Sequence, residues 1–163
     1  MTELYELSQE QDTQKGKFLT FRIGAELFAI EISYVTEINN MLSIVPLPDA
    51  PAYFKGVISL RGKIIPVIDM RLKLGKQPEP YNDRTCIIIL SVEGAQTGLI
   101  VDTVAEVLNI RDDDIERPPE MKHAAGSHYL QGIGKAEEDL VLILNCRKIL
   151  DGDAIFDLAQ IVS

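Results

Sequence analysis

The chain has no tryptophan, few aromatic residues and an unbalanced set of charges. Aromatic residues make up 6% of its 163 residues, and 16 Lys and Arg face 25 Asp and Glu, a net charge of −9. This charge would repel a phosphate backbone, which argues against nucleic acid as a partner. The two cysteines, Cys86 and Cys146, have no closely spaced companions, so we expect buried free thiols.

Long apolar runs are also missing. No run approaches the roughly 20 residues that would span a bilayer, and the N-terminus has no apolar core of signal-peptide length. We therefore expect a cytoplasmic protein without direct membrane insertion. Residues 1–16 are polar, rich in Gln and Glu and without periodicity, so we expect a flexible tail there.

From Lys17 onward, the sequence is dominated by short β-type patterns. Apolar residues alternate with polar ones on both sides of Gly24, and Arg61-Gly62-Lys63 separates two further apolar runs. Both interruptions predict hairpins, because glycine adopts positive φ at little cost. More β runs are predicted at 86–92, 98–101, 104–110 and 140–144.

Helical patterns are few. Asp153 could cap a C-terminal helix within 151–163, whose apolar stripe would dock on the β core. Shorter helical turns are predicted at 69–74 and 145–150, each opened by an Asp or Asn that follows a strand. The sequence thus predicts a mainly β fold with a C-terminal helix.

The chain also contains an internal repeat. A shift of 76 positions aligns Gly56 with Gly132, and chemically similar pairs follow: Val57 with Ile133, Ile68 with Leu144, Asp69 with Asn145, Arg71 with Arg147, Leu74 with Leu150. A shift of 69 aligns an earlier set: Leu19 with Ile88, Phe21 with Leu90, Ile30 with Leu99, Val35 with Val104, Glu37 with Glu106, Ile38 with Val107. Two similar units in succession predict two small barrels that share a core.

The repeat separates residues needed by the fold from candidates for function. Asp69 and Arg71 recur as Asn145 and Arg147, which indicates capping and pairing at a helix end. The basic turn 61–63 instead aligns with the acidic turn 137–139. The fold therefore does not require a basic turn, and Arg61 becomes a functional candidate.

The segment GVISLRGKIIPVIDMRLKLG, residues 56–75, resembles the central signature of the CheW family. The likeness extends over about 18–150, including VTEI at 35–38 and GLIVDTVAEVL at 98–108. It implies two five-stranded, SH3-like β-barrel subdomains within one domain at 17–150, with the helix of 151–163 packed on it. Members of this family are adaptors without catalysis or cofactors. They bind the cytoplasmic tips of methyl-accepting chemoreceptors and the regulatory domain of the histidine kinase CheA.

By motif, the resemblance assigns the chain's receptor contacts. Glu37 matches the acidic residue of the VxEI segment and Arg61 the arginine of the Leu-Arg-Gly turn. For Glu37, a structural role competes, since Glu106 recurs in the second unit. The full receptor-binding set is Val35, Glu37, Ile38, Leu60, Arg61 and Gly62. Met41 and Leu42 are candidate kinase contacts, although packing within the chain competes with that interpretation.

The remaining sequence motifs do not indicate a metal site or a catalytic site. His123 and His128 lack further metal ligands, and residues 112–114 form an acidic run without the pattern of an EF-hand loop. Phosphate-binding and nucleophile motifs are also missing. The alternative function is a small-ligand binder or an enzyme on a double barrel, which would need a concave pocket with convergent polar groups.

Overall fold

The computed structural model describes residues 15–117 and 129–150 and confirms a mainly β protein. The predicted C-terminal helix, both histidines and most of the predicted tail lie outside the described residues. The first half contains β1 Lys17–Ile23, β2 Glu26–Glu31, η1 Ile32–Tyr34, β3 Val35–Asn40, β4 Phe54–Leu60, β5 Lys63–Asp69 and α2 Met70–Lys73. The second half contains β6 Cys86–Val92, β7 Ala95–Val101, β8 Thr103–Asn109, η2 Asp112–Asp114, β9 Ile115–Glu116, β10 Leu130–Ala136, β11 Asp139–Leu144 and α3 Cys146–Leu150.

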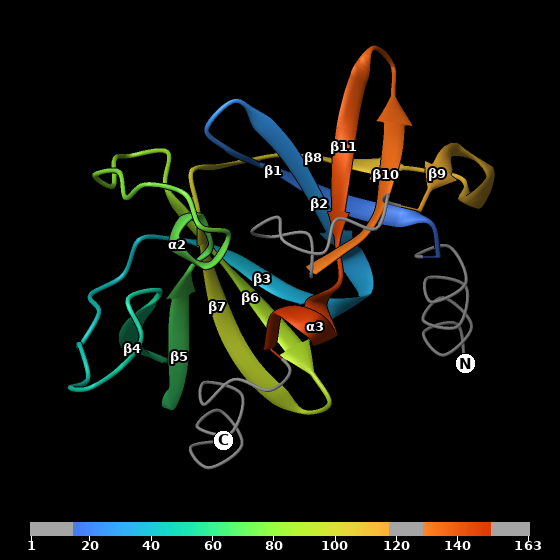
Figure 1. The fold of residues 1–163 in the computed structure, drawn as a ribbon. Coiled ribbons are helices and arrows are strands. Elements are labelled where there is room, and N and C mark those ends of the chain that lie inside the picture. The colour runs from blue at the N-terminus through green and yellow to red at the C-terminus, as the bar shows by residue number, and fades with distance from the viewer. Residues whose placement is uncertain (1–14, 118–128, 151–163) are drawn as a thin grey trace, which may run out of the picture.

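The strands form two sheets (Figure 1). One has six strands in the order β8-β1-β2-β11-β10-β9, and the other has five in the order β3-β6-β7-β5-β4. Most neighbouring strands are antiparallel, but β11 runs parallel to β2 and β5 runs parallel to β7. The six-stranded sheet exceeds the expected number because of the short strand β9. The SH3-like closure of each sheet stays a prediction.

The two halves of the repeat exchange strands. Shifted by 69 or 76 positions, β3, β6, β7, β5 and β4 correspond to β8, β1, β2, β11 and β10, and the two sheets keep these strands in the same order. Each sheet therefore contains strands from both halves of the sequence. The repeat is present, but neither half forms a sheet by itself.

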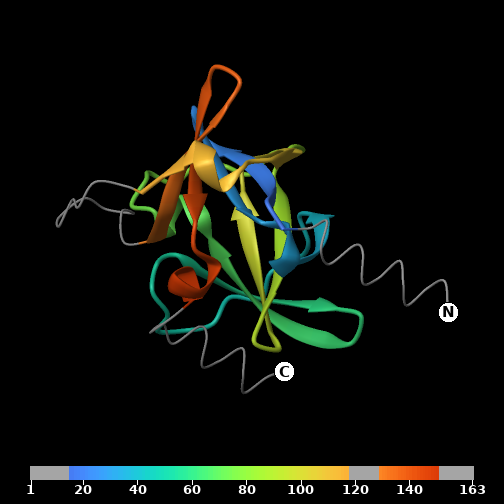
Figure 2. The same cartoon turned by 90° about the vertical axis from the view of Figure 1, so that its right-hand side faces the viewer.

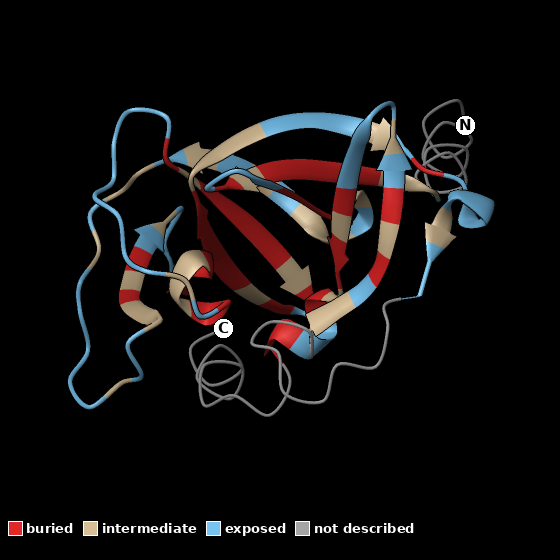
Figure 3. Cartoon of the chain, turned by 45° about the horizontal axis from the view of Figure 1, so that its top comes forward, coloured by how far each residue is buried: buried red, intermediate tan, exposed pale blue. Residues whose placement is uncertain are grey.

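Apolar residues on both faces of the strands explain this arrangement. In β6, Ile87 and Ile89 belong to an interior cluster whose buried residues all come from the five-stranded sheet. Ile88 and Leu90 point to the other face and belong to a larger cluster shared with β1 and β2. A third cluster around Phe18 and Val141 fills the six-stranded sheet. Figure 3 shows the buried residues along the strands and the exposed ones at the tip of the β10–β11 hairpin. A fully buried isoleucine contributes about 2 kcal/mol, so the continuous apolar run of β6 is a major source of stability.

The cysteines differ in burial. Cys146 lies at the start of α3 in the shared cluster, and burial raises the pKa of its thiol to about 12. Cys86, at the start of β6, is only partly buried. Both are free thiols, as expected, but the expected full burial is wrong for Cys86, because it begins its strand at the edge of the core.

In each sheet, a glycine allows another segment of the chain to approach a strand closely. The two glycines, Gly56 and Gly132, occupy equivalent positions in the repeat. The chain beyond β3 returns to β4 through a pair of hydrogen bonds between Val45 and Val57, both 2.9 Å. A Cβ on Gly56, which has φ +139°, would lie 2.1 Å from the carbonyl oxygen of Val45. In the second unit, β9 approaches β10 in the same way, and a Cβ on Gly132 would lie 2.6 Å from Ile115.

We expect Gly56→Ala to destabilise the fold by at least about 2 kcal/mol, because backbone atoms block the added methyl and φ +139° suits only glycine. The matched control is Gly62→Ala, where φ is +80° but nothing lies within 4 Å, and we expect a loss of about 1 kcal/mol. Urea unfolding of both variants measures the difference. Equal losses would contradict the role given to the close approach.

Candidate functional site

The turn between β4 and β5 presents the strongest functional candidate. Leu60 and Lys63 pair across the hairpin, so the turn has two residues, Arg61 and Gly62, with φ of 54° and 80°. Positive φ at both positions is the type I′ geometry that matches the twist of the flanking strands. The Arg61 side chain is 77% exposed at this tip.

Arg61 forms an ion pair with the other candidate charge. Its Nη2 lies 3.4 Å from Oε2 of Glu37, and Asn39 Nδ2 donates to the same oxygen at 3.1 Å. Glu37 is on β3 and Arg61 follows β4 directly, and these are the two outer strands of the five-stranded sheet. The sheet is therefore curled enough to bring its edges within reach of one side chain. Glu37 therefore has partners within the chain, Arg61 and Asn39, and its contact with a receptor stays a prediction.

The arrangement does not recur in the second unit. Glu106 is exposed, and its backbone rather than its side chain is engaged: Thr20 Oγ1 donates to its carbonyl at 2.7 Å and accepts from its N–H at 3.0 Å. Within 15–117 and 129–150, the Glu106 carboxylate has no ion-pair partner, since the equivalent of the basic turn is acidic. The Glu37–Arg61 pair thus distinguishes the first unit from the second.

The candidate residues of β3 divide between its two faces. Glu37 pairs with Ile89 of β6, and Ile38 with Ile88. Cross-strand partners share a face. Glu37 therefore lies on the side of the interior cluster, which contains Ile89, and Ile38 lies on the side of the shared cluster, which contains Ile88. Ile38 is 43% exposed, whereas Val35 packs against the shared cluster. Of the two expected apolar contacts, Ile38 is the more accessible.

Leu60, Met41 and Leu42 come together at the interior of the five-stranded sheet. All three are partly buried and pack on the cluster that contains Ile58 and Ile65. Packing within the chain therefore accounts for Met41 and Leu42, and kinase contact by them stays a prediction. The structure brings Arg61 close to Glu37, places Leu60 on the same side as Glu37, and leaves Ile38 on the opposite face of β3.

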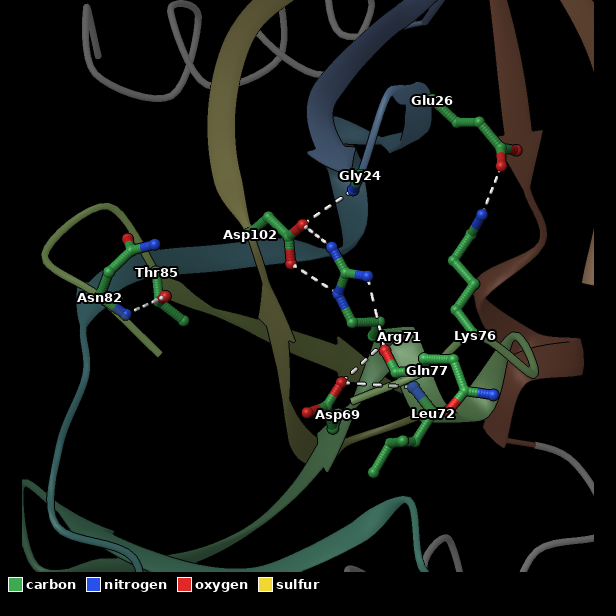
Figure 4. Close-up of polar contacts among 10 residues, drawn as sticks. All are labelled: Gly24, Glu26, Asp69, Arg71, Leu72, Lys76, Gln77, Asn82, Thr85 and Asp102. Atoms are coloured by element: carbon green, nitrogen blue, oxygen red, sulfur yellow. Dashed lines mark hydrogen bonds and ion pairs between the residues drawn. The ribbon is translucent and has the colours of Figure 1, made fainter. Parts of the chain in front are cut away.

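A second polar cluster surrounds α2 (Figure 4). Asp69 Oδ1 accepts from the N–H groups of Arg71 at 2.9 Å and Leu72 at 3.3 Å, which caps the helix as expected. Arg71 pairs with Asp102 through two nitrogens, and Asp102 Oδ2 also accepts from Gly24 N–H at 2.8 Å. The sequence did not single out Asp102. Its position just after β7 gave no signal of the pairing.

This second cluster links the sheets. Arg71 follows a strand of the five-stranded sheet, and Gly24 forms the β1–β2 turn of the six-stranded sheet. The equivalent Arg147 lies 3.2 Å from Glu93, in the β6–β7 turn of the opposite sheet. Each repeated arginine thus reaches a hairpin turn of the other sheet. The expected assignment of Asp69 and Arg71 to the fold agrees with these contacts.

Ionisation around α2 follows from the same contacts. Burial alone would raise the pKa of Asp102, but hydrogen bonds from Arg71 and Gly24 hold it below its usual value. Burial, and then the hydrogen bond to Asp69, raises the pKa of Tyr81. A cleft of about 160 Å³ lies between these groups. Three of its four charged side chains, Asp69, Arg71 and Asp102, bond to one another or to the backbone, and Glu79 also lines the cleft.

Comparison with known proteins identifies the family. Residues 17–154 match the model of the CheW-like domain. The chain belongs to the CheW family. Its CheW relatives include the chemotaxis protein CheW of Helicobacter pylori, which is 33% identical over 145 residues, covering 89% of this chain and 87% of the relative. The chemotaxis protein CheW of Klebsiella aerogenes is 32% identical over 142 residues, covering 87% of this chain and 86% of the relative.

A solved CheW structure agrees with the fold. The scaffolding protein TtCheW from Thermoanaerobacter tengcongensis superposes with a TM-score of 0.78 at 33% identity, covering 85% of this chain and 94% of the other. The CheW-like match includes both sheets and both polar clusters described above. In the described part of the chain, no helix has the length and hydropathy to cross a membrane, and no group of side chains could hold a metal ion.

We expect Asp102→Asn to lower the free energy of unfolding by about 1 kcal/mol at neutral pH, since the variant weakens a partly exposed ion pair. The folded-state pKa of Asp102 is lowered, so its stabilisation is present above the unfolded value of about 3.9 and is lost as pH falls through the folded value.

Denaturant unfolding from pH 7 to pH 3 tests this, with Asp113→Asn at an exposed position as the control. Wild type and Asp102→Asn should converge in acid, while the control changes stability by less than about 0.5 kcal/mol throughout. A gap that persists unchanged at pH 3 would show that charge is not the cause.

Proposed function

We propose that this chain is a cytoplasmic chemotaxis adaptor that couples methyl-accepting chemoreceptors to the histidine kinase CheA without catalysis of its own. The main support for this proposal is the match to the CheW-like domain over residues 17–154. The relatives named above are chemotaxis proteins, and the similar solved structure is that of a scaffolding protein. The receptor and kinase partners come from the family resemblance and are part of the proposal.

The receptor surface that we propose lies where β3 meets the tip of β4–β5. A receptor tip is a helical hairpin, and its docking needs apolar contact with a few orienting charges at the rim. Leu60 supplies apolar area on the same side as Glu37, Ile38 supplies exposed apolar area on the other face of β3, and the Glu37–Arg61 pair supplies charge. Because Arg61 is 77% exposed, it can contact a partner while it remains near Glu37.

The geometry gives less support to a small-ligand binder or an enzyme. Such a site needs polar groups that converge on an enclosed space. In the cleft beside α2, Asp69, Arg71 and Asp102 are used by contacts within the chain that cap the helix and link the two sheets. Adaptor function requires none of these groups to bind a ligand.

We expect Arg61→Glu to weaken binding to a receptor-tip fragment by about tenfold or more, because it puts a second carboxylate beside Glu37. Binding to the CheA regulatory domain should be retained. Thermal stability should change little, since an exposed ion pair contributes at most about 1 kcal/mol. Titration of the purified chain with each partner fragment measures the two affinities, and thermal unfolding measures the stability.

Lys63→Glu is the matched control, because it makes the same charge change in the same hairpin at an exposed residue without an ion pair in the described chain. Receptor binding of this control should remain within about threefold of wild type. If wild-type chain binds neither fragment, the adaptor function is wrong. A large loss of thermal stability in Arg61→Glu would make Arg61 a structural residue.

A further inference from the structure

Asn39 is a polar residue at a position of β3 that faces the interior cluster. It pairs with Ile87 across the sheet, as Glu37 pairs with Ile89, so both side chains lie on the side of that cluster. Asn39 is also partly buried. Asparagine is disfavoured in strands, and a buried amide is unfavourable unless it finds a hydrogen-bond partner. A specific contact must therefore compensate for its presence in β3.

That contact is a hydrogen bond to the Glu37 carboxylate. Asn39 Nδ2 donates to Oε2 of Glu37 at 3.1 Å, and Arg61 Nη2 lies 3.4 Å from the same oxygen. Arg61 is 77% exposed at the tip of a hairpin, so its pairing restrains the carboxylate only weakly. Asn39 instead projects from the same strand as Glu37, which fixes the donor relative to the acceptor. The orientation of the Glu37 side chain therefore depends mainly on Asn39.

The repeat shows that the fold does not require an amide at this position. A shift of 69 positions aligns Asn39 with Leu108 of β8, and Leu108 packs on the cluster inside the six-stranded sheet. The second unit keeps the glutamate but has neither partner of Glu37, because a leucine replaces Asn39 and an acidic residue replaces Arg61. Both partners of Glu37 are therefore particular to the first unit, which also carries the proposed receptor surface.

On the basis of the adaptor function above, we propose that Asn39 is a positioning residue for receptor binding, which holds the Glu37 carboxylate ready for contact. Oε2 receives Asn39 and Arg61, whereas Oε1 accepts no hydrogen bond within residues 15–117 and 129–150 and stays available to a donor on the receptor. A side chain ordered before binding does not have to be ordered during it. Asn39 also keeps a donor on Oε2 when Arg61 turns from Glu37 to the receptor.

Asn39→Leu removes the donor and copies the residue of the second unit. We expect binding of the purified full chain to a receptor-tip fragment to weaken by about fivefold, because Glu37 must then be ordered during binding. Binding to the CheA regulatory domain should be retained. The midpoint of thermal unfolding should equal or exceed that of wild type, because the new leucine can pack on the interior cluster as Leu108 packs on its own.

Asn109→Leu is the matched control, because it makes the same change at an exposed residue of β8. Strand β8 lies away from the β4–β5 hairpin in both views (Figures 1 and 2), so receptor binding should stay within about twofold of wild type. A double-mutant cycle with Glu37→Ala separates positioning from direct contact with the receptor. Once Glu37 is removed, Asn39→Leu should change receptor binding by less than about twofold, because it acts only through that carboxylate.

The hydrogen bond can also be tested without a partner. The NMR signal of the Asn39 side-chain amide should shift in Glu37→Ala, because the amide loses its acceptor. The side-chain amide signal of Asn109, in the opposite sheet, should keep its position. An unchanged Asn39 signal would contradict the hydrogen bond on which the positioning role depends.

Three binding results would overturn the positioning role. They are wild-type receptor affinity in Asn39→Leu, the same loss in Asn109→Leu, and losses that multiply when Asn39→Leu and Glu37→Ala are combined. A large fall in the unfolding midpoint of Asn39→Leu would also overturn it, since Asn39 would then be structural. In all of these cases the wild-type chain still binds the receptor fragment. If wild type binds no receptor fragment, the adaptor function is wrong and the positioning role fails with it.

Discussion

Burial of both faces of the central strands is the constraint on which the structure depends. Strand β6 is apolar almost throughout, and β1 is buried along most of its length; each has one face in the cluster of its own sheet and the other in the cluster shared with the opposite sheet. Neither sheet could leave its outer face in water, since that cluster contains the largest buried side chains, such as Phe21, Ile30 and Leu90. The two sheets are therefore one folding unit in energetic terms.

Strand exchange between the halves follows from the same constraint. Because β1 and β2 join strands of the second half, and β6 and β7 join strands of the first, the chain crosses from one sheet to the other after β2 and again after β7. The arginines that recur in the repeat then tie each sheet to a turn of the other, Arg71 through Asp102 and Arg147 through Glu93. These ion pairs add to the association of the two sheets, which depends mainly on burial of apolar side chains in the shared cluster.

The hairpin turns are the places where the two units differ. Their backbones agree at the first turn position, where Arg61 and Glu137 both adopt positive φ. Their side chains are not constrained by packing and have acquired opposite charges. In this fold, a repeated framework thus carries tips of opposite charge, and we place the receptor contact at the basic tip.

The sequence by itself determined the mainly β class, the repeat and the caps at Asp69 and Asn145, because these depend on local patterns of burial and backbone hydrogen bonding. It also indicated the turn at Arg61, since the change of charge between repeats is visible without coordinates. It did not indicate that Cys86 is only partly buried or that Glu37 and Ile38 face opposite ways.

Only the tertiary structure decided which strands share a sheet, the pairing of Arg71 with Asp102, and the approach of Val45 to Gly56. These contacts join residues distant in sequence, and their partners are selected by packing across the shared core, which local patterns do not encode.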